Sequence, residues 1–169
     1  MILRFTRTIW IHMPIVHIGI GSNLGDREEH CLRAIRLFSE KGIHVRRRSS
    51  MYETEPWGVK DQPRFVNMVI EGETGLTPAR LLEVLKMTED EVGRVETYRW
   101  GPRMIDLDML LYDDLVMNTP ELTIPHPRMH ERDFVLRPLA EIAPDKIHPV
   151  LKKTVRELLC VLHNEQKKL

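Results

Sequence analysis

Ten consecutive residues of this 169-residue chain combine the side chains that phosphate chemistry requires. The stretch from Arg99 to Asp108 contains two arginines, a tryptophan and two aspartates. The apolar residues after Pro102 alternate with the aspartates, which is the period of a β-strand, so Asp106 and Asp108 are expected on one face, roughly 6.5–7 Å apart. Paired carboxylates suit Mg²⁺, which also takes substrate phosphates, and arginines suit phosphate oxygens. The alternative is a solvated edge strand that carries two surface acids.

The composition is that of a globular protein without a global charge bias. Hydrophobic residues make up 42% of the chain and charged residues 30%, and basic and acidic side chains number 25 each. This balance does not favour nucleic acid or an anionic membrane as a partner. No apolar run reaches the roughly 18–20 residues of a membrane span. We therefore expect no nucleic acid and no membrane as partners. Separately from the composition, we expect small-molecule partners and a monomer or weak homodimer.

The length fits one domain with a sizeable core. Residues 1–12 are basic and apolar, and two arginines interrupt their apolar run, which makes a poor secretory signal. We expect residues 1–12 to be an N-terminal extension and residues 13–169 to form a single domain. Cys31 and Cys160 form no CxxC pair, so free thiols and a cytoplasmic location are expected.

Hydrophobic periodicity predicts the elements that must position the acidic stretch. The expected strands cover residues 14–20, 43–54, 65–71 and 104–111, with short extended pieces near 115–117 and 122–124. The expected helices cover residues 26–41 and 77–92, with two more before residue 144 and after residue 154. The turn that follows the first strand contains Gly21 and Gly25, and it is either a tight turn capped by Asp26 or a close approach of backbone to a ligand.

Two further segments carry polar groups in unusual places. Asn67 lies among apolar residues of an expected strand, and its amide would match a flat heterocycle such as a purine or pterin, or would bond neighbouring backbone instead. The preceding loop carries Trp57, which a plain surface loop does not require. Near residue 126, prolines argue against a helical zinc site, and phosphate contact by His126 and Arg132 is the better interpretation.

These motifs, in this order, resemble the 6-hydroxymethyl-7,8-dihydropterin pyrophosphokinase family. The matching blocks are Gly21-Ser22-Asn23-Leu24, Ser50 with Tyr52 and Thr54, Asp61-Gln62-Pro63 with Phe65 and Asn67, Gly93-Arg94, Arg99-Trp100-Gly101-Pro102-Arg103 with Ile105-Asp106-Leu107-Asp108, and Pro125-His126-Pro127 through Arg132, Phe134 and Pro138-Leu139. The resemblance extends from about Pro14 to Pro144. It implies a ferredoxin-like α+β sandwich, in which helices pack on the faces of a mainly antiparallel sheet.

The resemblance also implies a reaction and a set of residues. ATP would give its terminal diphosphate to the hydroxymethyl group of the dihydropterin, with release of AMP, in folate biosynthesis. Asp106 and Asp108 would bind two Mg²⁺ ions, and together with Arg94, Arg103 and Arg132 they form the implied catalytic set. The implied ATP-binding residues are Glu89, Arg94, Arg99, Arg103, Met109, Thr123, His126 and Arg132. The implied pterin-binding residues are Thr54, Trp57, Phe65, Asn67, Trp100 and Phe134.

Three residues depart from the pattern that the resemblance leads us to expect. Glu96 stands where the family often has an arginine, Arg64 stands where an acid is common, and Trp57 is bulkier than the usual residue of its loop. Two other functions fit parts of the sequence. One is a different Mg-dependent phosphoryl-transfer or nucleotide-hydrolysing enzyme, and the other is a non-catalytic ferredoxin-like binding module.

Overall fold

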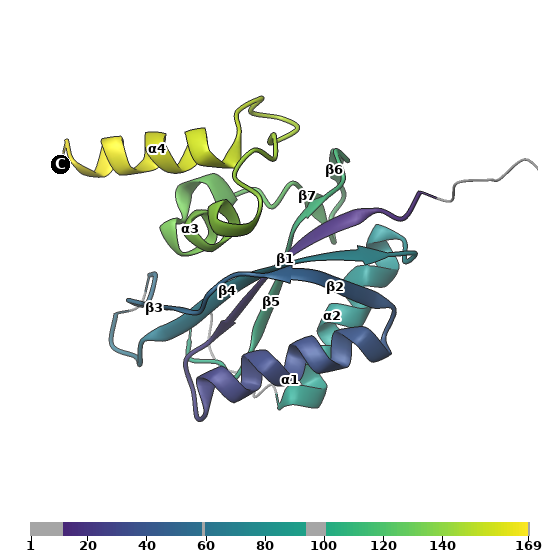
Figure 1. Ribbon diagram of the computed structural model, residues 1–169. Coiled ribbons are helices and arrows are strands. Elements are labelled where there is room, and N and C mark those ends of the chain that lie inside the picture. Colours follow the sequence, from purple (N-terminus) through teal and green to yellow (C-terminus); the bar gives the residue numbers. More distant parts are fainter. Residues whose placement is uncertain (1–11, 59, 94–100, 169) are drawn as a thin grey trace, which may run out of the picture.

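An antiparallel sheet is the centre of the computed structural model, which describes residues 12–58, 60–93 and 101–168. Its strands are β1 (Ile15–Ser22), β2 (Ile43–Arg48), β3 (Tyr52–Thr54), β4 (Phe65–Thr74) and β5 (Asp106–Tyr112). The order is β2-β4-β1-β5, and β3 lies beside the N-terminal part of β4. Every pair of neighbours is antiparallel. The expected α+β sandwich with an antiparallel sheet is confirmed (Figure 1).

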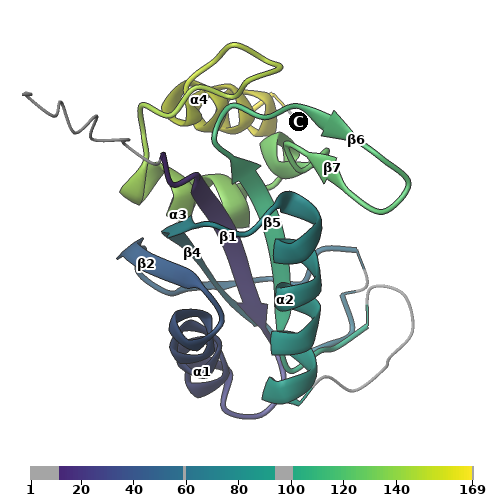
Figure 2. The same ribbon diagram turned by 90° about the vertical axis from the view of Figure 1, so that its right-hand side faces the viewer.

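Helices cover both faces of this sheet. On one face lie α1 (Arg27–Glu40) and α2 (Pro78–Val92), and on the other lie α3 (Asp133–Ile142) and α4 (Val155–Gln166), as Figures 1 and 2 show. A small hairpin of β6 (Met117–Asn118) and β7 (Thr123–Ile124) and the 3₁₀ turn η1 (Met129–Glu131) connect β5 to α3. No helix in the described part of the chain has both the length and the apolar character needed to cross a membrane.

The helix ends follow from local side chains. The Asp26 carboxylate accepts a hydrogen bond from the Glu29 N–H, and the Thr77 hydroxyl accepts one from the Arg80 N–H, so both caps satisfy otherwise unpaired donors. Gly93 ends α2 with a φ of 119°, a backbone conformation that favours glycine.

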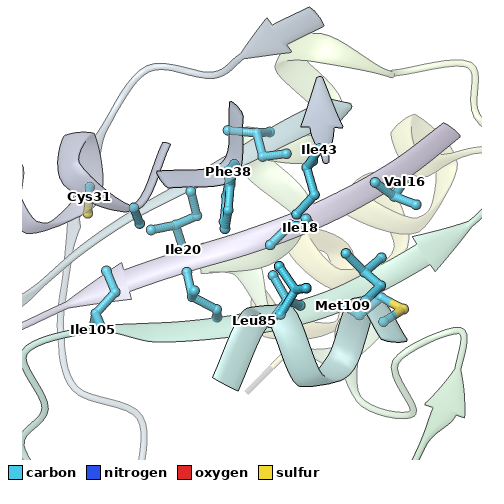
Figure 3. Close-up of a cluster of buried hydrophobic side chains, with 14 of the residues drawn as sticks. Val16, Ile18, Ile20, Cys31, Phe38, Ile43, Leu85, Ile105 and Met109 are labelled. Atoms are coloured by element: carbon cyan, nitrogen blue, oxygen red, sulfur yellow. The ribbon is translucent and has the colours of Figure 1, made fainter. Parts of the chain in front are cut away.

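The alternation of side chains along β1 and β4 builds the core on the α1 and α2 face. Val16, Ile18 and Ile20 are at most 2% exposed and pack in one cluster with Phe38 of α1 and Leu85 of α2 (Figure 3). A second cluster, which includes Val69, Leu110 and Leu136, joins the opposite face to α3. The sheet is thus anchored on both sides, and apolar burial of this kind contributes roughly 25 cal/mol per Å².

The expectation of one strand over residues 43–54 is wrong. Two strands, β2 and β3, share the edge of β4 and are separated by residues 49–51. Ser49 causes the break, because its hydroxyl accepts the Val69 N–H at 2.9 Å in place of a backbone carbonyl. Glu141 then accepts from the backbone N–H and the hydroxyl of Ser50, which draws the interruption towards α3.

Candidate active site

A cavity of about 750 Å³, including space open to solvent, lies on the α3 face of the sheet. Its walls come from β1, β3, β4, β5, the loop after β3 and the start of α3. The lining residues are Gly19, Ile20, Gly21, Thr54, Glu55, Trp57, Gln62, Phe65, Asn67, Met68, Val69, Gly101, Arg103, Asp106, Asp108, Leu110, Arg132, Phe134 and Val135. One wall is rich in carboxylates and guanidinium groups, and the other is rich in aromatic and amide groups.

The charged wall is organised around Asp106 and Asp108 of β5. Strand alternation puts both carboxylates on the cavity side, with side chains 34% and 37% exposed. Arg103 Nη1 donates to Asp106 Oδ1 at 2.7 Å, and Arg132 Nη1 lies 3.9 Å from Asp108 Oδ2. Burial, and then the neighbouring Asp106 carboxylate, raise the pKa of Asp108 to about 7, against the opposing effect of Arg132. A cation between the two carboxylates would relieve this repulsion.

These two carboxylates fit Mg²⁺ rather than a metal held by a full set of protein ligands. Among the described residues, no group of three or more His, Cys, Asp or Glu side chains is placed to hold a metal ion. Mg²⁺ is usually bound through one or two carboxylates, with water and substrate phosphates as its other ligands. The donor set present in the cavity therefore matches a metal that arrives with a nucleotide.

Arg132 connects the charged wall to the aromatic wall. Its side chain is 8% exposed, and its guanidinium carbon lies 5.1 Å from the ring centre of Trp57 and 5.6 Å from that of Phe134. Within the described structure, its buried Nε atom has no hydrogen-bond partner. Burial lowers the pKa of Arg132. The guanidinium stays charged nevertheless, because its ordinary pKa lies far above neutral pH. An anion in the cavity could accept the unused N–H.

His126 is a neutral neighbour of this cluster. Burial, and then the charge of Arg132, lower its pKa to about 4. Its Nδ1 atom accepts the Arg128 N–H at 3.2 Å, so the proton of the neutral ring is on Nε2. The backbone N–H of His126 donates to the Leu110 carbonyl, which fixes the segment against β5.

The other wall is formed around Asn67 of β4. This residue is 8% exposed, and its Nδ2 atom donates to the Thr54 hydroxyl at 2.6 Å. The expectation that the Asn67 amide bonds neighbouring backbone is therefore wrong for its N–H donor. A side-chain hydroxyl of β3 accepts that hydrogen bond instead. Phe65 and Phe134 add apolar surface to the same wall. An amide next to aromatic rings suits a flat, polar heterocycle.

The structure brings nine of the sequence-predicted residues to this one cavity. They are Thr54, Trp57, Phe65, Asn67, Arg103, Asp106, Asp108, Arg132 and Phe134. Four others do not line it, namely Glu89, Met109, Thr123 and His126. The predictions for Arg94, Arg99 and Trp100, and the departure at Glu96, concern residues outside the described part of the chain.

Like His126, the other three residues off the cavity wall have clear structural contacts. Glu89 is 4% exposed and accepts the Leu107 N–H at 2.8 Å, so it supports the outer edge of β5 and also raises the pKa of Asp108. Met109 is 4% exposed and packs in the α1 and α2 core. Thr123 donates to Asn118 across the β6–β7 hairpin.

Two positions that support the cavity were missing from the sequence-predicted set. A Cβ atom added to Gly21 would lie 2.8 Å from Asn67 Oδ1, so only glycine leaves room for that amide. Asn23, 1% exposed, donates to Gln62 Oε1 and the Pro63 carbonyl and accepts the Arg103 N–H. The glycine-bearing turn was the signal for both residues, and it joins the two walls of the cavity.

Comparison with known proteins identifies the family to which this chain belongs. Residues 17–144 match the family described as 7,8-dihydro-6-hydroxymethylpterin-pyrophosphokinase (HPPK). The chain belongs to this family. It is 44% identical over 145 residues to the Aquifex aeolicus 2-amino-4-hydroxy-6-hydroxymethyldihydropteridine pyrophosphokinase, which covers 86% of this chain and 90% of the relative. It is 48% identical over 129 residues to the Bacillus subtilis enzyme of the same name, covering 76% and 77% of the two chains.

Solved structures agree on the fold. The wild-type Plasmodium falciparum HPPK-DHPS structure matches 93% of this chain with a TM-score of 0.75 and 16% identity. The chain spans about half of that longer protein, 46% of its length. The family resemblance and the ferredoxin-like fold predicted from the motifs are confirmed.

Proposed function

We propose that this HPPK transfers the terminal diphosphate of ATP to the hydroxymethyl group of 6-hydroxymethyl-7,8-dihydropterin and releases AMP, in folate biosynthesis. Membership of a pyrophosphokinase family supports this reaction. The structural observation that carries the proposal is the single cavity in which a carboxylate–arginine wall faces an amide–aromatic wall. The two walls suit the two substrates, one anionic and one flat and heterocyclic.

We assign the charged wall to ATP and to two Mg²⁺ ions held by Asp106 and Asp108. When bound, these ions would neutralise phosphate charge and orient the triphosphate. In the structure, Arg103 and Arg132 pair with the same two carboxylates. Once the carboxylates hold metal, both guanidinium groups are available to the phosphate oxygens. Arg94 and Arg99, and then Glu89, Met109, Thr123 and His126, complete the proposed nucleotide-binding set.

We assign the aromatic wall to the pterin. Asn67, oriented by Thr54, would bond the ring edge, and Phe65 and Phe134, with Trp57 and Trp100, would enclose the ring. The hydroxymethyl group would then lie close to the charged wall. Because diphosphate transfer requires little covalent chemistry from the protein, positioning and the stabilisation of phosphate charge by Arg103 and Arg132 account for most of the rate.

We also propose that the protein works in the cytoplasm as a monomer or weak homodimer, with no nucleic acid or membrane partner. The balanced charge supports the absence of a polyanionic partner. Two free cysteines, Cys31 buried and Cys160 exposed, fit a reducing compartment. Residues 13–169 would be the single catalytic domain, with residues 1–12 a dispensable extension whose removal leaves turnover unchanged.

Product analysis tests the reaction. The enzyme is incubated with MgATP in the presence and absence of 6-hydroxymethyl-7,8-dihydropterin, and nucleotides and pterins are separated by chromatography. The expected result is AMP and pterin diphosphate in equal amounts, only when pterin is present. AMP or ADP formed equally well without pterin would instead support a nucleotide hydrolase, and binding without turnover would support a non-catalytic module.

A further inference from the structure

Trp57 contacts two arginines of a segment that is remote from it in sequence. The guanidinium carbon of Arg128 lies 4.4 Å from the centre of the Trp57 ring, and that of Arg132 lies 5.1 Å from it. A guanidinium within about 6 Å of an indole centre makes an attractive cation–π contact. The loop after β3 is therefore tied to the turn between β7 and α3.

The two arginines differ in their relation to the cavity. Arg132 lines it and is buried, whereas Arg128 does not line it and its side chain is 43% exposed. Trp57 lines the cavity and is 38% exposed. Arg128, the closer of the two cations, therefore acts on the cavity wall through the Trp57 indole and does not contact the cavity itself.

Arg128 is itself held in place. Its N–H donates to His126 Nδ1, its carbonyl accepts the Glu131 N–H, and its Nε atom lies 3.3 Å from Glu131 Oε2. Its charge also contributes to the lowered pKa values of His126 and Arg132, which means that three basic groups converge there. A fixed cation gives the loop a defined place to dock.

We propose that Arg128 is a positioning residue, which stacks on Trp57, holds the indole at the cavity wall and thereby strengthens pterin binding without contact with the pterin. This inference rests on the assignment of the aromatic wall to the pterin. It explains why a bulky aromatic at position 57 fits a chain that carries an arginine at position 128. Removal of the Arg128 guanidinium would remove the closer of two cation–π contacts, worth about 0.5–1 kcal/mol at exposed sites, or about 2- to 5-fold in affinity.

The test measures pterin and nucleotide binding separately in Arg128→Met, Arg128→Lys, Trp57→Leu and the double variant. Isothermal titration gives the Kd of a non-hydrolysable ATP analogue with Mg²⁺, and then the Kd of hydroxymethylpterin on the preloaded enzyme. For Arg128→Met we expect the pterin Kd to rise about 2- to 5-fold and the analogue Kd to stay unchanged. Arg128→Lys retains a cation and should recover part of the loss. In the Trp57→Leu background, Arg128→Met should have no further effect.

Arg80→Met is the matched control. Arg80 pairs with Glu83 at i,i+3 as Arg128 pairs with Glu131, but it does not line the cavity and no aromatic contact accompanies it in the described structure. This variant should leave both Kd values unchanged, and thermal melts show that each variant is folded. A loss that persists in the Trp57→Leu background, or that falls on the ATP analogue, would overturn the positioning role. Failure of the wild type to bind pterin would contradict the proposed function instead.

Discussion

The two faces of the sheet are formed by the same strands, but one face packs the core and the other forms the cavity. Towards α1 and α2, β1 presents Val16, Ile18 and Ile20, all almost fully buried. Towards the cavity the same strand presents Gly19 and Gly21, and β4 and β5 present Asn67, Asp106 and Asp108. Strand alternation therefore separates stability from chemistry without separate structural elements. Substitutions on one face should change the free energy of unfolding, and those on the other should change catalysis.

Substitution of the carboxylates should give the largest effect and should fall on catalysis alone. Asp106→Asn and Asp108→Asn keep side-chain shape but remove metal-binding charge. Loss of one electrostatic stabiliser costs about 10²–10³ in rate, so loss of metal as well should cost at least about 10³-fold in kcat. Steady-state assays measure kcat and urea denaturation measures stability. The control is Asp114→Asn, because Asp114 is an exposed acid that pairs with Lys146 outside the cavity lining. Near-normal turnover in either variant would break the comparison.

Substitutions on the α1 and α2 face should change stability and leave catalysis nearly unchanged. Ile18→Ala removes a fully buried side chain from the core and should lower the free energy of unfolding by about 2–5 kcal/mol. The kcat per folded molecule should stay within about twofold, because Ile18 points away from the cavity. Urea denaturation measures the first quantity and active-site titration the second. Val161→Ala, at an exposed position of α4, should change stability by less than about 0.5 kcal/mol.

Two glycines of one strand sharpen the comparison within the cavity face. Gly21→Ala forces a methyl group to within 2.8 Å of Asn67 Oδ1, whereas Gly19→Ala meets Leu110 at an ordinary 3.6 Å. Overpacking costs about 1–3 kcal/mol, and displacement of the amide should place most of this cost on pterin binding, at about tenfold in Kd. Titration with hydroxymethylpterin checks the result. Equal Kd values for the two variants would show that Asn67 does not recognise the pterin.

Local patterns predicted much of this arrangement. Alternation placed Asp106 and Asp108 together, and the expected helix starts near residues 26 and 77 agree with the caps at Asp26 and Thr77. The family motifs then assigned chemistry to the cavity. These features depend on residues close in sequence, and therefore a single chain contains enough information to predict them.

Contacts between distant segments were not predictable in the same way. The break at Ser49 depends on Val69, and the orientation of Asn67 depends on Thr54. The bonds from Asn23 to the 62–63 loop and to Arg103 exist only after three loops meet. Tertiary proximity, which no local pattern encodes, decides these details.

The smallest effect we expect is a change in how the free energy of unfolding depends on pH. The folded-state pKa of His126 is lowered to about 4, from about 6.5 in a free imidazole. Between these values the unfolded chain binds a proton that the folded protein does not, so stability should fall as the pH is lowered from 6.5 towards 4. His126→Gln should reduce that slope by at most about 1.4 kcal/mol per pH unit.

His148, whose pKa is also lowered by burial, should preserve the remaining slope in this variant. Denaturation midpoints at several pH values measure the difference between wild type and variant. Ile18→Ala, which removes no titrating group, should lower the whole curve and keep its slope. Parallel curves for His126→Gln and wild type would mean that His126 titrates alike in both states. The burial of His126 would then impose no pH-dependent cost on folding.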